Sequence, residues 1–169
     1  MKTLADVFRV LNEMRSDGIL DDYAVGGAMA MLFYAEPTRT YDLDVFVMLP
    51  ETTAGVALIS LERIYSWARS RGLALEAEHV MIHGVPVQFL PAYNELVEEA
   101  IRTARELAYE DVPVRVVDPE RLIALAVQAG GAKRRERAWQ LIETGEIDRA
   151  LLRVVLARHH LVFEIPDDL

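Results

Sequence analysis

Apolar residues alternate between helical and extended spacing along the chain, and this pattern predicts its elements. From Leu4 to Met14 they recur every three or four positions, which predicts a helix that Thr3 caps and Gly18 ends. A short apolar run at 23–25 then precedes two glycines and a stretch of good helix formers. The sequence therefore predicts a strand, a glycine turn and a second helix in succession.

The middle of the chain continues with alternating strands and helices. The predicted elements are a strand at 43–49, a helix from Thr53 to Ser70, strands at 77–82 and 85–90, a helix at 92–107 and a strand at 112–117. The two strands at 77–82 and 85–90 flank His83-Gly84, which is typical of a two-residue hairpin turn. We expect both hairpin histidines, His79 and His83, to lie at the surface.

The last third of the chain is predicted to be helical. Asp118 followed by proline is a good helix start, the glycines at 130–131 interrupt the pattern, and Asp148 is placed to cap the last helix. An α/β core at 1–117 thus precedes a C-terminal helical subdomain at 118–169. This split favours an α+β class with a mixed β-sheet flanked by helices over a doubly wound parallel sheet.

Composition narrows the class of protein. The chain has 169 residues, 52% of them hydrophobic and 27% charged, which suits one domain or a small domain with a helical appendage. The absence of cysteine excludes disulfides, thiolate zinc sites and cysteine nucleophiles. No apolar run approaches the roughly 20 residues that span a bilayer, and Asp6 and Arg9 interrupt what a signal peptide would need. We expect a soluble, cytoplasmic protein.

The formal charge of −9 argues against general nucleic-acid coating, which needs net positive charge. All of the excess acid lies in residues 1–111, whereas the remainder carries equal numbers of acids and bases. Lys133, Arg134, Arg135 and Arg137 form the one basic cluster of the sequence. This cluster either contacts a nucleotide or an RNA acceptor, or forms a solvated helix face.

Two local signals point to phosphate chemistry. Asp42 and Asp44 are two residues apart on a predicted strand, so their carboxylates share one face. Like charges placed together favour a compensating cation, and Mg²⁺ is commonly held by one or two carboxylates plus substrate phosphates. Gly26-Gly27, between a strand and a helix, allows the backbone to approach a phosphate closely. The alternatives are a solvated strand start and an ordinary tight turn.

Together these residues resemble a known family. Gly26-Gly27, a helix, and then the run Arg39-Thr40-Tyr41-Asp42-Leu43-Asp44 are similar to the signature of the DNA polymerase β-like nucleotidyltransferase superfamily. The nearest resemblance is to the AbiEii-type nucleotidyltransferases, the toxins of type IV toxin–antitoxin systems. A looser resemblance covers the helices at 119–125 and 133–141. It implies a nucleotidyltransferase fold with a C-terminal helical subdomain.

The resemblance also implies roles. Asp42 and Asp44 would be catalytic and hold Mg²⁺, Gly26 and Gly27 would cradle the NTP triphosphate, and Lys133 would contact phosphate. Nucleotide binding would also involve Arg39 and Thr40, although Arg39 could equally be a solvated loop residue. The reaction would move an NMP to a hydroxyl of RNA (tRNA in some relatives), of a protein or of a small molecule, and the partner would be an antitoxin protein.

Two departures from the family pattern bear on activity. Gln88 stands where a third carboxylate is expected, and a neutral amide cannot accept a proton at pH 7. Glu76, Glu78 or Glu95 could substitute, and Glu136 could replace an aspartate of the family's last helices. Losing a general base typically costs about 10²–10⁴-fold in rate. The alternative is a catalytically impaired nucleotide-binding or protein-partner module.

Overall fold

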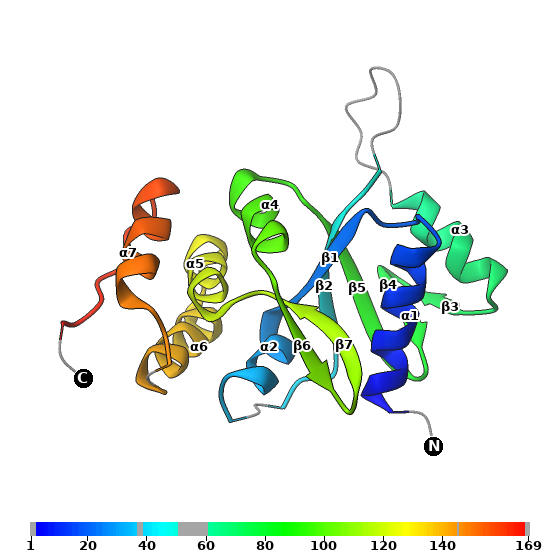
Figure 1. Ribbon diagram of the computed structural model, residues 1–169, viewed down its shortest axis with the longest axis horizontal. Helices are drawn as coiled ribbons and strands as arrows, with labels where there is room; N and C mark the ends of the chain where they lie inside the picture. Colours follow the sequence, from blue (N-terminus) through cyan, green and yellow to red (C-terminus); the bar gives the residue numbers. More distant parts are fainter. Residues whose placement is uncertain (1–2, 37–38, 51–60, 145, 168–169) are drawn as a thin grey trace.

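The computed structural model describes residues 3–36, 39–50, 61–144 and 146–167, in which a mixed sheet carries helices on both faces (Figure 1). The strands are β1 (Asp22–Gly26), β2 (Leu43–Met48), β3 (Ala74–Glu76), β4 (His79–Ile82), β5 (Val85–Pro91), β6 (Arg105–Tyr109) and β7 (Val112–Val116). Within the described residues the seven strands follow the order β3-β4-β5-β2-β1-β7-β6. β1 runs antiparallel to β2 and parallel to β7, and β2 runs parallel to β5. The mixed sheet of the predicted α+β class is confirmed.

The helices are α1 (Leu4–Ser16), α2 (Gly27–Ala30), the 3₁₀ turn η1 (Met31–Phe33), α3 (Glu62–Ser70), α4 (Glu95–Arg102), α5 (Pro119–Ala129), α6 (Ala132–Glu143) and α7 (Arg149–Arg158). Helices α1 and α3 lie on one side of the sheet and α4 lies on the other, with α5, α6 and α7 beyond it (Figure 1). Asp118 and Asp148 accept hydrogen bonds from the first turns of α5 and α7, as their capping positions predict. The division into two domains at residue 118 stays a prediction.

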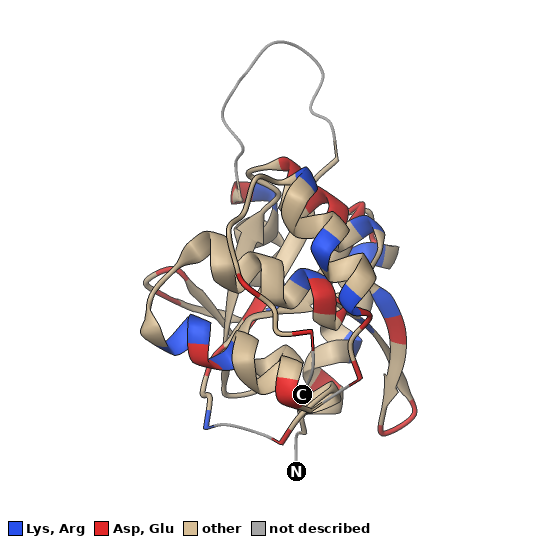
Figure 2. Ribbon diagram, turned by 90° about the vertical axis from the view of Figure 1, so that its left-hand side faces the viewer, with Lys and Arg blue, Asp and Glu red and all other residues tan. Residues whose placement is uncertain are grey.

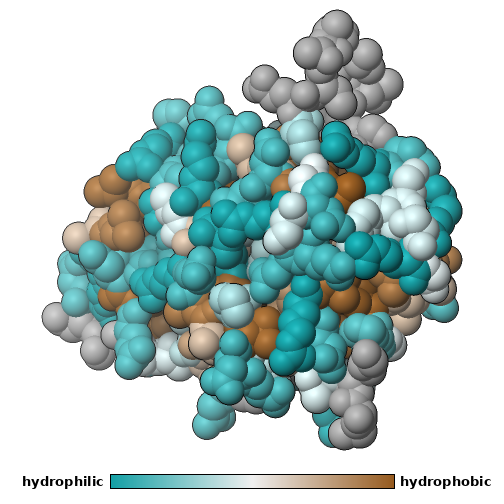
Figure 3. Space-filling model, turned by 45° about the vertical axis from the view of Figure 1, so that its right-hand side comes forward, coloured by the Kyte–Doolittle hydropathy of each residue, from teal (hydrophilic) through white to brown (hydrophobic). Residues whose placement is uncertain are grey.

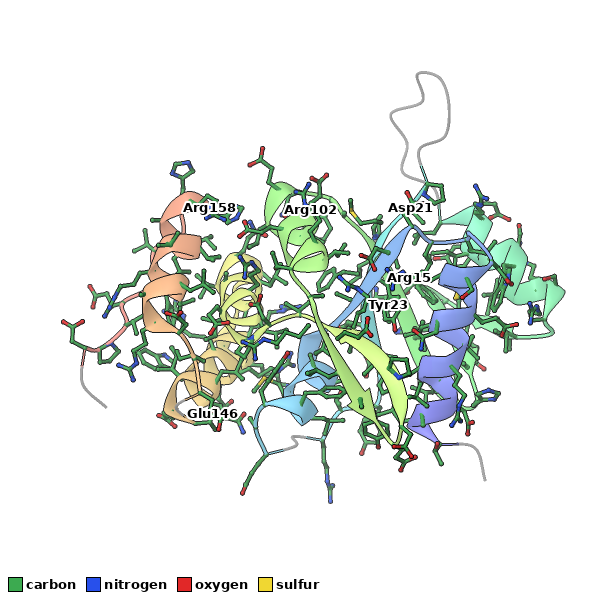
Figure 4. The ribbon with its side chains drawn as sticks, in the orientation of Figure 1. Arg15, Asp21, Tyr23, Arg102, Glu146 and Arg158 are labelled. Carbon is green, nitrogen blue, oxygen red and sulfur yellow. The ribbon has the colours of Figure 1, made fainter. Side chains whose placement is uncertain are left out.

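Side-chain alternation gives the central strand β2 two different faces. Leu43, Val45 and Val47 are fully buried on the side that carries α1, where the Tyr23 hydroxyl donates to Asn12 of that helix at 2.7 Å (Figure 4). The alternate residues of β2 point to the opposite side, toward α4 and α5. One face of the sheet is therefore packed against α1, and the other face can contribute side chains to a binding surface.

Some predicted elements differ in the structure. The helix predicted at 92–107 ends at Arg102, because the chain turns there into β6, which pairs with β7 in an antiparallel hairpin. The second helix, predicted after the two glycines, is only the four residues of α2 followed by the 3₁₀ turn. The sequence also gave no sign of β3. The cap predicted at Thr53 lies outside the described residues, and α3 begins at Glu62.

A charged cluster joins α4 to the C-terminal helices. Glu99 of α4 accepts hydrogen bonds from Arg121 of α5 at 2.9 Å and from Arg158 of α7 at 2.5 Å. The His159 ring nitrogen lies 2.6 Å from the second oxygen of the same carboxylate. Figure 4 places Arg158 at the end of α7 that lies level with α4. Burial alone would raise the pKa of Glu99, but the hydrogen bonds to its carboxylate outweigh this effect and lower the pKa to about 2.

The outer surface is mostly hydrophilic, with hydrophobic residues confined to patches on the face that Figure 3 shows. Within the described part of the chain, no helix has the length and apolar character that crossing a membrane requires.

Candidate functional site

Asp42 and Asp44 lie at the start of β2, at the mouth of a cleft of about 500 Å³ between the sheet and helices α5 and α6. Asp42 is exposed, whereas Asp44 is half-buried. Both line the cleft, as does Phe46 two residues further along the same face. The strand thus presents the two carboxylates side by side to one cavity, as the sequence predicts.

The glycine turn lies directly against the second carboxylate. Gly26 pairs with Asp44 in the β1–β2 ladder, and Gly27 follows with a φ of +59°. A Cβ atom at Gly27 would lie 2.1 Å from Oδ2 of Asp44, and one at Gly26 would lie 2.4 Å from the Phe46 ring. A side chain at either position would therefore force the neighbouring Asp44 or Phe46 side chain to move. Because α2 has only four residues, it supplies little helix dipole for an anion. The turn therefore serves mainly to bring its backbone close to the Asp44 carboxylate.

The electrostatics of Asp44 favour a cation. Burial raises the pKa of this carboxyl, and the charge of Asp42 raises it further. The charges of Arg137, Arg134 and His79 act in the opposite direction without overcoming that rise. The ionised pair is costly in the protein alone, so a bound cation at this place would stabilise it.

The donor set fits Mg²⁺ rather than a metal that the protein alone encloses. Among the described residues, no group of three or more histidine, aspartate or glutamate side chains could hold a metal ion. Two adjacent carboxylates without a third nevertheless suit Mg²⁺, which keeps waters and takes further oxygens from substrate phosphates. Asp42 and Asp44 are the residues that would hold it.

Positive charge faces the carboxylates from α6. Arg134 and Arg137 are three positions apart, so they share a helix face, and both line the cleft. Lys133, the phosphate contact expected from the resemblance, is exposed and does not belong to the described lining; Arg135 and Glu136 are exposed as well. Figure 2 shows the basic residues clustered on this helix. The rotation of α6 therefore brings the two arginines to the cavity.

Gln88 occupies the position of the expected third carboxylate. It pairs with Asp44 in the parallel β2–β5 ladder and lines the same cleft. The three glutamates that could substitute are elsewhere: Glu76, Glu78 and Glu95 are exposed, and none is among the described lining residues. The carboxylates therefore have an amide as their neighbour on β5.

The approach to β2 carries the remaining predicted residues. Arg39 is exposed, and the hydroxyl of Thr40 donates to the backbone carbonyl of Asp42 at 3.2 Å. Neither belongs to the described cleft lining. Thr40 thus shapes the backbone that leads into the acidic strand, and a nucleotide contact by Arg39 stays a prediction.

Sequence reasoning did not find the apolar wall of the cleft. It is formed on α5 and α6 by Leu122, Leu125, Ala126, Ala129, Ala138 and Leu141. Tyr93, which is 57% exposed, also lines the cavity. One sequence signal could have indicated this wall. Apolar residues surround much of α5, whereas a helix that covers a core with one face needs them on that face only.

The fold has known counterparts among solved structures, although no family model and no curated protein matches the sequence. One is an antigenic nucleotidyltransferase-like protein from Paracoccidioides brasiliensis, 16% identical, with a TM-score of 0.53 over 92% of this chain and 86% of that one. Another is ANT(2″)-Ia in complex with adenylyl-2″-tobramycin, 16% identical, with a TM-score of 0.56 over 94% of this chain and 98% of that one. The chain therefore has a nucleotidyltransferase fold, as the sequence predicts.

Proposed function

We propose that this protein is a nucleotidyltransferase that moves an NMP from an NTP, bound with Mg²⁺, to a hydroxyl group of an acceptor. The observation that carries the proposal is the pair Asp42 and Asp44, set against the glycine turn and facing Arg134 and Arg137 across one cleft. Negative charge on one wall and positive charge on the other suit a metal-bound polyphosphate.

Each side chain has a distinct part in this proposal. Asp42 and Asp44 would hold Mg²⁺, which when bound supplies positive charge to the phosphates of the substrate. Arg134 and Arg137 are placed to hydrogen-bond the triphosphate and to offset charge on the departing pyrophosphate. Gly27 leaves the space that the Asp44 carboxylate occupies, and the apolar wall on α5 excludes water from the reacting groups.

The acceptor class and the biological role belong to the same proposal. RNA, including tRNA ends, is the acceptor class that the resemblance to AbiEii-type toxins favours, and a cognate antitoxin would be the protein partner. The basic residues at the start of α6 support an RNA acceptor, because Lys133 and Arg135 are exposed beside the cleft arginines. A protein or small-molecule hydroxyl is the other outcome that the labelling experiment below distinguishes.

The experiment compares the natural protein with an Asp42→Asn, Asp44→Asn double variant. Both are incubated with NTPs labelled at the α-phosphate, with Mg²⁺, and with total RNA or cell lysate. We expect label to pass to one acceptor class with the natural protein only, and calorimetry to show loss of Mg²⁺-dependent NTP binding in the folded variant. Asp111→Asn, an exposed turn residue remote from the cleft, is the matched control. Unchanged Mg²⁺-dependent NTP affinity in the folded double variant would overturn the proposal.

One observation favours a second candidate function. Gln88 leaves the cleft without a carboxylate beside Asp44 on β5, which is compatible with a nucleotide-binding module that acts through a protein partner. Such a module would bind NTP with Mg²⁺ but transfer no label to any acceptor. The same experiment therefore separates the two functions, because binding and transfer are measured independently.

A further inference from the structure

A single row of paired residues crosses five of the seven described strands at the level of the acidic pair. Gly26 on β1 pairs with Asp44 on β2, and Asp44 pairs with Gln88 on β5. Gln88 in turn pairs with His79 on β4, and His79 pairs with Glu76 on the edge strand β3. Directly paired residues point to the same face of a sheet, so Asp44, Gln88 and His79 share one face. Asp44 and Gln88 line the cleft, whereas His79 stands one strand further along, outside the described lining.

The spacing of the strands sets the distance between the two ends of this row. Neighbouring strands lie about 4.8 Å apart, so the backbones of Asp44 and His79 are separated by roughly 10 Å. Gln88 stands between them. A hydroxyl group that lies over Gln88 would therefore be within reach of both a group held at Asp44 and the His79 ring.

His79 is half-buried and held in a defined place. On the same strand, Val80 and Ile82 point to the opposite face of the sheet, where both are fully buried in the core. Within the described part of the chain, the His79 ring makes no hydrogen bond, so both of its nitrogens are open to a ligand. A positive charge on this ring would lower the pKa of the Asp44 carboxyl, by less than Arg137 and Arg134 do.

Building on the nucleotidyltransferase proposed above, we propose that His79 is the general base that activates the acceptor hydroxyl. In this step a ring nitrogen of His79 accepts the hydroxyl proton while the acceptor oxygen bonds to the α-phosphorus. The bond between the α-phosphorus and the bridging oxygen breaks, and pyrophosphate leaves with that electron pair. The protonated ring returns its proton to water after product release.

The other candidates for this role fit less well. The amide of Gln88 cannot accept a proton at neutral pH. Glu76 is a further strand away, at the exposed edge of the sheet, and His83 is exposed in the hairpin turn. Imidazole changes its protonation between pH 5 and 8, which suits proton transfer near neutrality. His79 is thus the base that the register brings nearest to the acidic pair.

The role predicts a defined pH dependence. The charged groups on the same sheet face are Glu76 from β3 and Asp44 from β2, with Arg134 and Arg137 opposite them on α6. The base must be neutral to act, so the transfer rate at saturating NTP should fall as the pH is lowered and the ring is protonated. The part of that fall that belongs to the ring should be absent where His79 has been replaced, leaving only the part due to protonation of Asp44.

The experiment measures transfer from NTP labelled at the α-phosphate to total RNA, with lysate protein as a parallel acceptor, in the natural protein and three variants. His79→Gln should lower kcat by about 10²–10⁴-fold, leave the KM for NTP unchanged and alter the acid side of the pH profile, where only protonation of Asp44 then remains. Adding Gln88→Asp to His79→Gln should restore much of the rate, since a carboxylate then stands beside Asp44. His83→Gln is the matched control and should behave as the natural protein.

The outcomes separate this role from the proposed function. Transfer by the natural protein together with an unchanged kcat in His79→Gln would overturn the base role alone. A loss that keeps the natural pH profile and is not relieved by Gln88→Asp would also overturn it, because it would mark His79 as a structural residue. Absence of transfer by the natural protein to both acceptors would overturn the proposed function, and the base role with it.

Discussion

The carboxylate of Asp44 occupies the space that a side chain at Gly27 would need. Its Oδ2 atom lies 2.1 Å from the position of a Cβ at that residue, where the backbone also has a φ of +59°. Two features therefore require a glycine at this position: the Asp44 carboxylate, which fills the space of a side chain, and the positive φ of the backbone. This relationship gives a direct test of the site.

Gly27→Ala should abolish Mg²⁺-dependent NTP binding. The added methyl group cannot share the space of the Asp44 carboxylate, so the carboxylate must leave its present position. The positive φ alone costs about 1–2 kcal/mol for a residue with a side chain. Isothermal calorimetry with NTP and Mg²⁺ measures the binding, and urea unfolding measures the stability.

The matched control for this change is Gly18→Ala. Gly18 has a φ of +73° after α1, and no atom lies within 4 Å of the position of its Cβ. It should show the conformational cost alone and bind NTP as the natural protein does. Equal NTP affinity in both variants would show that the carboxylate does not depend on the glycine.

Asp44→Asn should stabilise the protein at neutral pH while impairing its function. Burial and the charge of Asp42 raise the pKa of Asp44, so the folded state binds a proton at this carboxyl more tightly than the unfolded state does. Ionised Asp44 therefore destabilises the fold, and this cost develops as the pH rises through and above the ordinary range of an aspartate. The asparagine variant avoids it, with an expected gain in Tm on the order of a few degrees.

Thermal unfolding at pH 7 and at pH 3 checks this prediction. The difference in Tm between Asp44→Asn and the natural protein should shrink toward zero at the lower pH, where both side chains are neutral. Asp111→Asn, in the exposed β6–β7 turn, should show no such pH-dependent gain. A gain of the same size at both pH values would contradict the electrostatic cause.

Arg134→Ala and Arg137→Ala should each weaken NTP binding by about tenfold or more, since hydrogen bonds to charged groups contribute about 1.5–3 kcal/mol. Both side chains line the cleft opposite the carboxylates. Arg135→Ala removes the same charge from the same helix at a position outside the described cleft lining, so it is the matched control. Calorimetric titration at two salt concentrations separates direct contact from general charge; an equal loss in Arg135→Ala would indicate only a general effect.

The sequence was sufficient for the parts of the site that depend on local signals. The spacing of Asp42 and Asp44 predicts a shared face because side chains alternate along any strand, and Gly26-Gly27 marks a turn wherever it stands. The capping residues Asp118 and Asp148 were predicted for the same reason, since a helix cap involves only neighbours along the chain.

What could not be predicted depends on contacts between distant segments. His79 was expected at the surface with His83, because its place in the row follows from the pairing of β5 with β2, which no short stretch of sequence encodes. Which basic residues face the cleft depends on the rotation of α6 against α5. The helix predicted at 92–107 was too long. Residues 105–109 form a strand because they pair with β7, and local helix propensity does not reveal that pairing.

The last prediction concerns the cluster that joins α4 to α5 and α7. Although burial opposes ionisation, hydrogen bonds from His159, Arg121 and Arg158 lower the pKa of Glu99 from an ordinary 4.5 to about 2. Because the folded pKa lies below the unfolded one, this carboxylate stabilises the fold above about pH 4.5, and that contribution is lost as the pH falls toward 2.

Glu99→Gln should therefore lower the free energy of unfolding at pH 7 by on the order of 2 kcal/mol, because it leaves Arg121 with Asp118 alone and removes the charge that holds Arg158 and His159. Urea unfolding at pH 7 and at pH 3 measures the effect, which should be much smaller at the lower pH. Glu98→Gln is the matched control: its 3.5 Å ion pair with Arg102 is exposed and should contribute about 0.5 kcal/mol or less. Equal losses in the two variants would show that the buried cluster adds no more stability than a surface ion pair, and that α7 is held to α4 by apolar packing through α5 instead.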